Sequence, residues 1–143
     1  MQQIGRWTVV SVLAGLVLGL FLKAVQFMTD IKVYTLLLNI DYMPVLSRWE
    51  LGELGEFTLH LLVGIVIGNV LQWFIQYKEL RQSYQFFVII IASLVVAVTY
   101  YPVTILSDQT PELGSLSAFL WWMLGHLLYG MALYYFYKKI VKD

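Results

Sequence analysis

FTLHLLVGIVIGNVLQWFIQY, residues 57–77, is an apolar run that contains no Asp, Glu, Lys or Arg. A helix needs roughly 20 apolar residues to cross a hydrocarbon core about 30 Å thick, so this run is long enough to span a bilayer. Three further runs of similar length occupy residues 7–28, 86–106 and 116–137. None of them alternates apolar and polar residues as membrane β-strands do. The sequence therefore predicts an all-α fold: a bundle of four transmembrane helices that forms one integral membrane domain over residues 1–143.

The composition also indicates a bilayer. Of the 143 residues, 60% are hydrophobic and 13% are charged, whereas soluble domains carry about 45–50% and about 25%. The mean hydropathy is +0.75. Nine Lys and Arg balance nine Asp and Glu, so the chain has no net positive field for nucleic acid. The absence of cysteine excludes disulfides, thiol chemistry and Cys-ligated metals.

The distribution of Lys and Arg predicts the orientation of the bundle. We interpret the first run as a retained span, because it is longer than the 7–15 residues of a signal-peptide core. Basic residues then gather at one side of the membrane, which the positive-inside rule assigns to the cytoplasm. They are Arg6, Lys78, Arg81, Lys138, Lys139 and Lys142. Both termini are therefore expected inside, and the opposite, outer face is acidic.

One connection is long, residues 29–56 between the first two spans. Its apolar stretch, residues 34–40, is too short to cross the bilayer. This stretch is expected to lie along the outer interface or to extend the first helix, with Pro44 marking a turn. Two interpretations stay open: a cap over the bundle, or a partly ordered surface loop.

Small residues recur every four positions in the spans. In lipid, such residues let two helix backbones approach closely. The glycines expected to serve helix packing are Gly15, Gly19, Gly64, Gly68 and Gly130. Because the first two spans are antiparallel neighbours, their small-residue faces are expected to meet, and a seam between copies of the chain is the alternative.

Polar groups at membrane depth are costly and raise a functional hypothesis. The candidate polar cleft consists of His60, Asn69, Gln72, Thr99 and His126. At 1.5 Å per residue, Asn69 and His126 share a depth near the midplane, and a hydrogen bond between them is expected. By the same count, the depths of the two histidines in the membrane differ by about 10 Å, which is incompatible with two axial ligands of one haem. No cofactor is therefore expected.

Acidic residues at the outer boundary form a candidate rim for a metal ion. They are Glu53, Glu56, Asp108 and Glu112. Carboxylate oxygens with one imidazole from His60 are suitable ligands for a cation. The same acids are equally well explained by a solvated rim at the favourable end of a helix dipole. Lys23 is expected to extend to the outer interface or to pair with Asp30 or Glu56.

Pro102 interrupts the third apolar run. It removes one helical hydrogen bond and frees the carbonyl of Val98. A kink there is expected to open a small outward cavity, with hydroxyls from Thr99 and Thr104 nearby; a normal helix end is the alternative. No catalytic motif accompanies these features. A His-Glu-x-x-His pair is absent, and Ser117, one of the two serines near a histidine in the sequence, lies about 13 Å along the same helix from His126. An enzyme is not expected.

The layout resembles small bacterial membrane proteins of the YqhR and YagU type. The resemblance rests on a Gly-containing first span that ends in Lys23 and Phe27-Met28-Thr29, a long acidic loop, Tyr101-Pro102, Pro111 and Gly125-His126-Leu127. It implies a protein of the bacterial inner membrane and supplies no catalytic residues.

Two functions are consistent with the sequence. The first is a non-enzymatic membrane protein that acts through helix packing, either as a homo-oligomer or as an accessory subunit of a larger membrane complex. The second is a small transporter or a ligand-binding or ion-binding protein with a polar intramembrane cleft.

Overall fold

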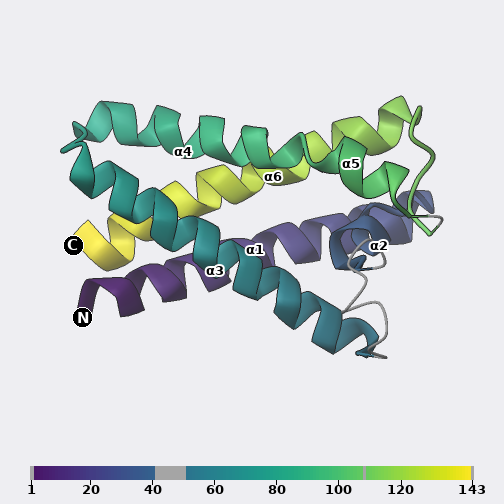
Figure 1. Ribbon diagram of the computed structural model, residues 1–143, viewed down its shortest axis with the longest axis horizontal. Helices are drawn as coiled ribbons and strands as arrows, with labels where there is room; N and C mark the ends of the chain where they lie inside the picture. The colour runs from purple at the N-terminus through teal and green to yellow at the C-terminus, as the bar shows by residue number, and fades with distance from the viewer. Residues whose placement is uncertain (1, 41–50, 108, 143) are drawn as a thin grey trace.

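The computed structural model describes residues 2–40, 51–107 and 109–142, and no strand occurs in these ranges. Its elements are the helices α1 (Gln2–Thr29), α2 (Val33–Leu38), α3 (Gly52–Tyr77), α4 (Gln82–Ala97), α5 (Tyr100–Ile105) and α6 (Leu116–Tyr137), and the π-helical continuation η2 (Lys138–Lys142). Both termini lie at the end of the bundle that also holds the turn between α3 and α4 (Figure 1). The helix α2 lies at the opposite end.

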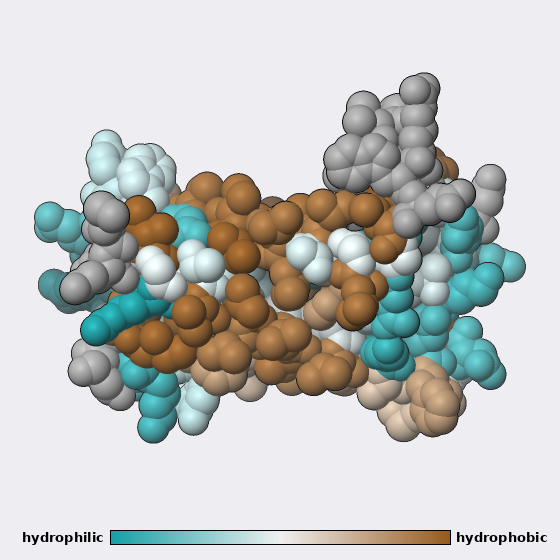
Figure 2. Space-filling view, turned by 90° about the horizontal axis from the view of Figure 1, so that it is seen from below, coloured by the Kyte–Doolittle hydropathy of each residue, from teal (hydrophilic) through white to brown (hydrophobic). Residues whose placement is uncertain are grey.

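Four helical segments are long and apolar enough to cross a membrane. They are Ile4–Thr29, Gly52–Tyr77, Gln82–Ile105 and Leu116–Val141. Apolar side chains form a belt around the middle of the face seen in Figure 2, and hydrophilic residues gather at both ends of it. The expectation of an all-α protein with four spans is confirmed, and the chain is a multi-pass helical membrane protein. The second span begins earlier than the apolar run suggested, at Gly52.

The four long helices do not form a closed ring. The helices α1 and α6 pack against each other, α3 packs on α1, and α4 packs on α6. Beyond their connecting turn, α3 and α4 have little contact, and they diverge toward the end that holds α2 (Figure 1). At the other end Trp7 and Tyr137 join α1 to α6, with ring centroids 4.6 Å apart. The bundle is therefore closed at the end that holds the termini and splayed at the other.

The predicted packing glycines mostly serve contacts inside this one chain. A Cβ on Gly15 would meet Leu61, and one on Gly19 would meet the ring of Phe57, both on α3. In the reverse direction, Gly68 of α3 accommodates Ser11 of α1. Each of these glycines thus receives a side chain from the facing helix.

The remaining two glycines differ. Gly130 of α6 is in close contact with Ser93 and Ile90 of α4. At Gly64 the nearest atom to an added Cβ is the hydroxyl of Tyr129, 3.9 Å away. A side chain at Gly130 would therefore clash with α4, whereas Gly64 leaves space at the boundary between α3 and α6.

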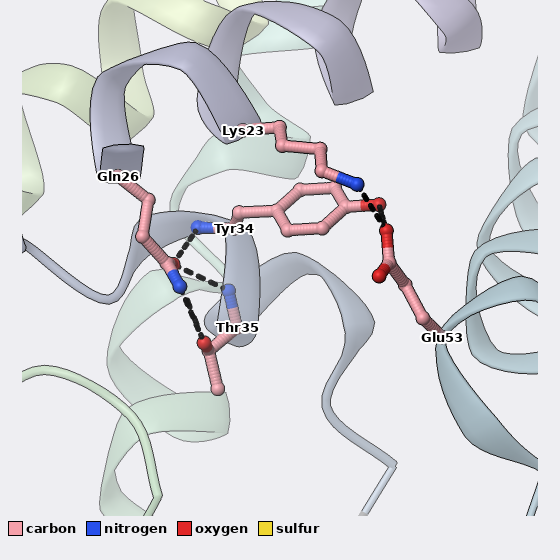
Figure 3. A network of polar contacts seen from close by, with 5 residues as sticks. All are labelled: Lys23, Gln26, Tyr34, Thr35 and Glu53. Carbon is pink, nitrogen blue, oxygen red and sulfur yellow. Dashed lines mark hydrogen bonds and ion pairs between the residues drawn. The ribbon is translucent and has the colours of Figure 1, made fainter. Parts of the chain in front are cut away.

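The helix α2 covers the splayed end of the bundle. Val33, Leu36, Leu37 and Leu38 are buried, and α2 packs on α1, α3 and α6. The first N–H groups of a helix lack partners within it, and here the Gln26 side-chain oxygen accepts hydrogen bonds from the backbone N–H groups of Tyr34 and Thr35, both at 2.9 Å (Figure 3). Most of the stretch 34–40 thus belongs to a separate capping helix and does not extend α1. Pro44 lies outside the described residues.

The third span is broken between α4 and α5. In a continuous helix the Tyr101 N–H would bind the Ala97 carbonyl, but it instead donates to Val98, 3.4 Å away. Pro102 has no N–H to take the Val98 carbonyl, which explains this shift. The Trp122 indole of α6 donates to the Ala97 carbonyl at 2.9 Å. The break predicted from Pro102 is confirmed, and the carbonyl that it releases is Ala97.

Candidate functional site

A cavity of about 690 Å³ lies between α3 and the broken span α4–α5. Its volume falls within the range of about 300–1,000 Å³ that is typical of small-molecule sites. The walls are mainly apolar, and α2 with the following two residues lines one side. The polar and aromatic lining groups are Asn39, Glu56, His60, Thr99, Trp122 and His126. Because Thr99, Pro102 and Val103 also line it, the structure has a cavity beside Pro102 as expected, and this cavity is larger than the small one that the sequence suggested.

The two histidines line this cavity together, from α3 and α6. The expected offset of about 10 Å was wrong, because it was counted from residue 57 and not from the true start of the helix. Counted from Gly52, His60 lies about 12 Å along α3, whereas His126 lies about 15 Å along α6 from Leu116. The imidazoles are close enough to interact electrostatically.

His126 is held by its own helix. Its Nδ1 lies 2.9 Å from the Trp122 carbonyl, and its ring centroid is 4.5 Å from that of the Trp122 indole. A carbonyl only accepts hydrogen bonds, so Nδ1 carries the proton. The ring is 2% exposed, and the ion pair found among the described residues, Lys23–Glu53, lies elsewhere. An imidazolium at this position would be a buried unpaired charge, so the ring is neutral and Nε2 presents a lone pair.

A second, smaller cavity of about 50 Å³ lies beyond the histidines. Its lining includes His60, His126, Gly64, Ser93 and Tyr129. The two histidines also line the larger cavity, so the two cavities adjoin at the imidazoles. The Tyr129 hydroxyl is buried without a hydrogen-bond partner. His60 likewise makes no hydrogen bond within the described ranges. Three polar side chains with unused hydrogen-bonding capacity therefore meet at this junction.

Two residues of the predicted polar cleft lie elsewhere. Asn69 donates to the Ile65 carbonyl of its own helix at 2.8 Å, so the expected hydrogen bond to His126 does not form. Gln72 is buried. Neither residue lines either cavity. Thr99 does line the larger one, although its hydroxyl donates to the Val96 carbonyl at 2.7 Å.

The described members of the predicted acidic rim, Glu53, Glu56 and Glu112, do not form a metal site with one another. No group of three or more His, Asp or Glu suited to a metal occurs in the ranges that the structure describes. Glu56 lines the large cavity, and Asp108 lies outside the described residues. Glu112 lies on the connection between α5 and α6, where its backbone carbonyl accepts from the Tyr100 hydroxyl at 3.4 Å.

Glu53 has a structural partner instead. It forms an ion pair with Lys23 and accepts a hydrogen bond from the Tyr34 hydroxyl at 3.1 Å (Figure 3). Burial, together with the neighbouring carboxylates of Glu53 and Glu56, raises the pKa of Tyr34 to about 12. Tyr34 therefore stays neutral and donates to Glu53. The partner of Lys23 is neither of the two acids expected, and this network ties α1, α2 and α3 together beside the cavity.

Sequence reasoning missed Trp122 and Tyr129. Both face the bundle interior with His126, at spacings of four and three residues along α6. That spacing was visible in the sequence as a polar-aromatic stripe. The spacing alone does not reveal against which neighbouring helix this stripe of α6 packs.

The comparisons with known proteins give no relative. No protein-family model matches the chain, and neither a curated protein nor a solved structure matches it significantly.

Proposed function

We propose that this protein binds a small amphipathic molecule inside the membrane, in the cavity between α3 and α4–α5. The observation that carries the proposal is that His60 and His126 line both an apolar cavity of about 690 Å³ and the smaller cavity beside it, which Tyr129 also lines. Pockets for small molecules combine mainly apolar walls with a few convergent polar groups. Ionisable side chains at membrane depth are functional candidates by default.

The glycine contacts favour this function over one based only on helix packing. Gly15, Gly19, Gly68 and Gly130 are occupied by side chains of the same chain. They are therefore not available as a seam toward a second copy or a larger partner. An accessory role in a larger membrane complex remains the second hypothesis, and the experiment below distinguishes the two.

For the location, we propose the bacterial inner membrane with both termini in the cytoplasm. The support is the gathering of Arg6, Lys78, Arg81 and the C-terminal lysines at one end of the bundle, which the positive-inside rule places on the cytoplasmic side. The cavity then lies in the outer half of the membrane, below α2.

The test is native mass spectrometry of the protein extracted gently from its own membrane. Val66 lines the cavity and is 62% exposed, so Val66→Trp fills the cavity without entering the packed core. Val70 lies one turn further along α3, is 58% exposed and lines neither cavity, so Val70→Trp is the matched control.

We expect a retained small molecule on the wild type and on Val70→Trp, with at least a tenfold loss on Val66→Trp. Equal retention by all three proteins would refute the cavity as the binding site. A larger protein released at fixed stoichiometry, with no small molecule retained, would favour the accessory role.

A further inference from the structure

The junction between the two cavities specifies the polar group of the ligand. Resting on the proposed function, we infer that the ligand is a neutral lipid alcohol whose hydroxyl lies between His126, His60 and Tyr129. The apolar chain of this alcohol occupies the larger cavity.

The first argument is the fixed tautomer of His126. Its Nδ1 proton goes to the Trp122 carbonyl, so Nε2 accepts and cannot donate. A ligand that satisfies Nε2 must bring an O–H or N–H. An ester, an ether or a ketone brings none.

The second argument is the unused capacity on the other side of the junction. The buried Tyr129 hydroxyl, on a side chain only 7% exposed, has no partner and both donates and accepts. His60 also has both capacities in its neutral form. One hydroxyl that donates to His126 and accepts from Tyr129 or His60 satisfies these groups, which are otherwise costly to bury.

The third argument is charge. Among the described residues, neither lining includes a Lys or an Arg. An anionic carboxylate or phosphate would find no cation among these described lining residues. An ammonium at the junction would lie among neutral rings, at the cost of an unpaired charge in a low-dielectric site. A neutral hydroxyl avoids both costs.

The experiment compares four amphiphiles that share one chain length: hexadecan-1-ol, its methyl ether, palmitate and hexadecylamine. Each competes, at defined mole fraction in nanodiscs of zwitterionic lipid, with a photoreactive hexadecanol that labels the protein. For the wild type we expect the alcohol to compete about tenfold better than the ether, because the ether oxygen still accepts a hydrogen bond but has no O–H to donate to Nε2 of His126. The acid and the amine are expected to be weaker than the alcohol.

Variants locate the effect. His126→Leu is expected to bring the alcohol-to-ether ratio close to one. Tyr129→Phe is expected to weaken competition by the alcohol and the ether alike, because both have an oxygen that accepts from Tyr129, and to leave the ratio unchanged. Asn69→Leu removes a polar group from the same part of α3 that lines neither cavity, so it should retain the full ratio. Tyr129→Phe and the ligand series on the wild type keep the test decisive if His126→Leu does not fold.

The outcomes separate the inference from the function on which it rests. An equal effect of alcohol and ether, or stronger competition by the acid or the amine, would overturn the alcohol while leaving the cavity as a binding site. Labelling that no amphiphile displaces and that Val66→Trp does not reduce would overturn the binding function itself. A ratio of about ten that the His126 variant lowers, with weaker competition by both ligands on the Tyr129 variant, would support both.

Discussion

Trp122→Phe is the substitution whose cost is best defined by the structure. The indole N–H of Trp122 binds the Ala97 carbonyl at 2.9 Å and thereby joins α6 to the break between α4 and α5. A buried polar group left without a partner costs about 1–3 kcal/mol. In membranes, double-mutant cycles of interhelical hydrogen bonds average about 0.6 and reach about 1.7 kcal/mol. Adding about 1 kcal/mol for lost packing of the second ring, we expect the free energy of unfolding to fall by about 2–3 kcal/mol.

The neighbouring residue offers a matched control. Trp121 is partly buried, contacts Phe21 at a ring-centroid distance of 6.1 Å and makes no hydrogen bond through its indole in the described part of the chain. Trp121→Phe should therefore cost about 1 kcal/mol or less. The assay is equilibrium unfolding in mixed micelles with a rising fraction of SDS, followed by far-ultraviolet circular dichroism. Equal costs for the two substitutions would refute the role of the indole hydrogen bond.

Three further substitutions test other parts of the bundle. Gly19→Ala places a methyl group against the ring of Phe57 and should lower the free energy of unfolding by about 1–3 kcal/mol. As its control, Gly5→Ala meets open space and should leave the free energy of unfolding unchanged or slightly raised. Similar losses at both positions would contradict the α1–α3 packing. Gln26→Met removes the acceptor of two N–H groups of α2. Hydrogen exchange of those two amides should accelerate about tenfold, while the exchange rates of the α6 amides stay unchanged. Unchanged exchange of the α2 amides would show that α2 does not depend on this cap. Asn69→Leu removes a buried amide oxygen that has no partner and should leave thermal stability equal or higher; a marked loss would reveal a partner for that oxygen.

The apolar runs were sufficient to predict the fold class and the four spans, because bilayer thickness alone sets the length of such a helix. They did not predict the order of packing, in which α1 and α6 lie between α3 and α4. Lipid is as apolar as the helix surfaces, so hydropathy does not show which faces meet. The splay between α3 and α4, and with it the cavity, follows from that order.

For the candidate site, the sequence predicted three of the cavity's polar residues, His60, Thr99 and His126. The error over the histidine offset came from the start of α3. Gly52 has a φ of 63°, a left-handed conformation that favours glycine, and the helix begins there, ahead of the apolar run. Asn69 was misplaced because a helix offers its own carbonyl four residues back to such a side chain. A cross-helix partner is therefore not required.

The central claim is that an amphipathic molecule occupies the cavity between α3 and α4–α5. The most direct measurement is photolabelling of the protein in a bilayer with a diazirine-bearing hexadecanol, followed by mass spectrometry of the labelled positions. We predict adducts concentrated on cavity-lining residues such as Leu59, Val63 and Val103. Few adducts are expected at Val70 and Val95, which are exposed but line neither cavity. Adducts that follow exposure to lipid alone, with no excess in the cavity, would contradict the account.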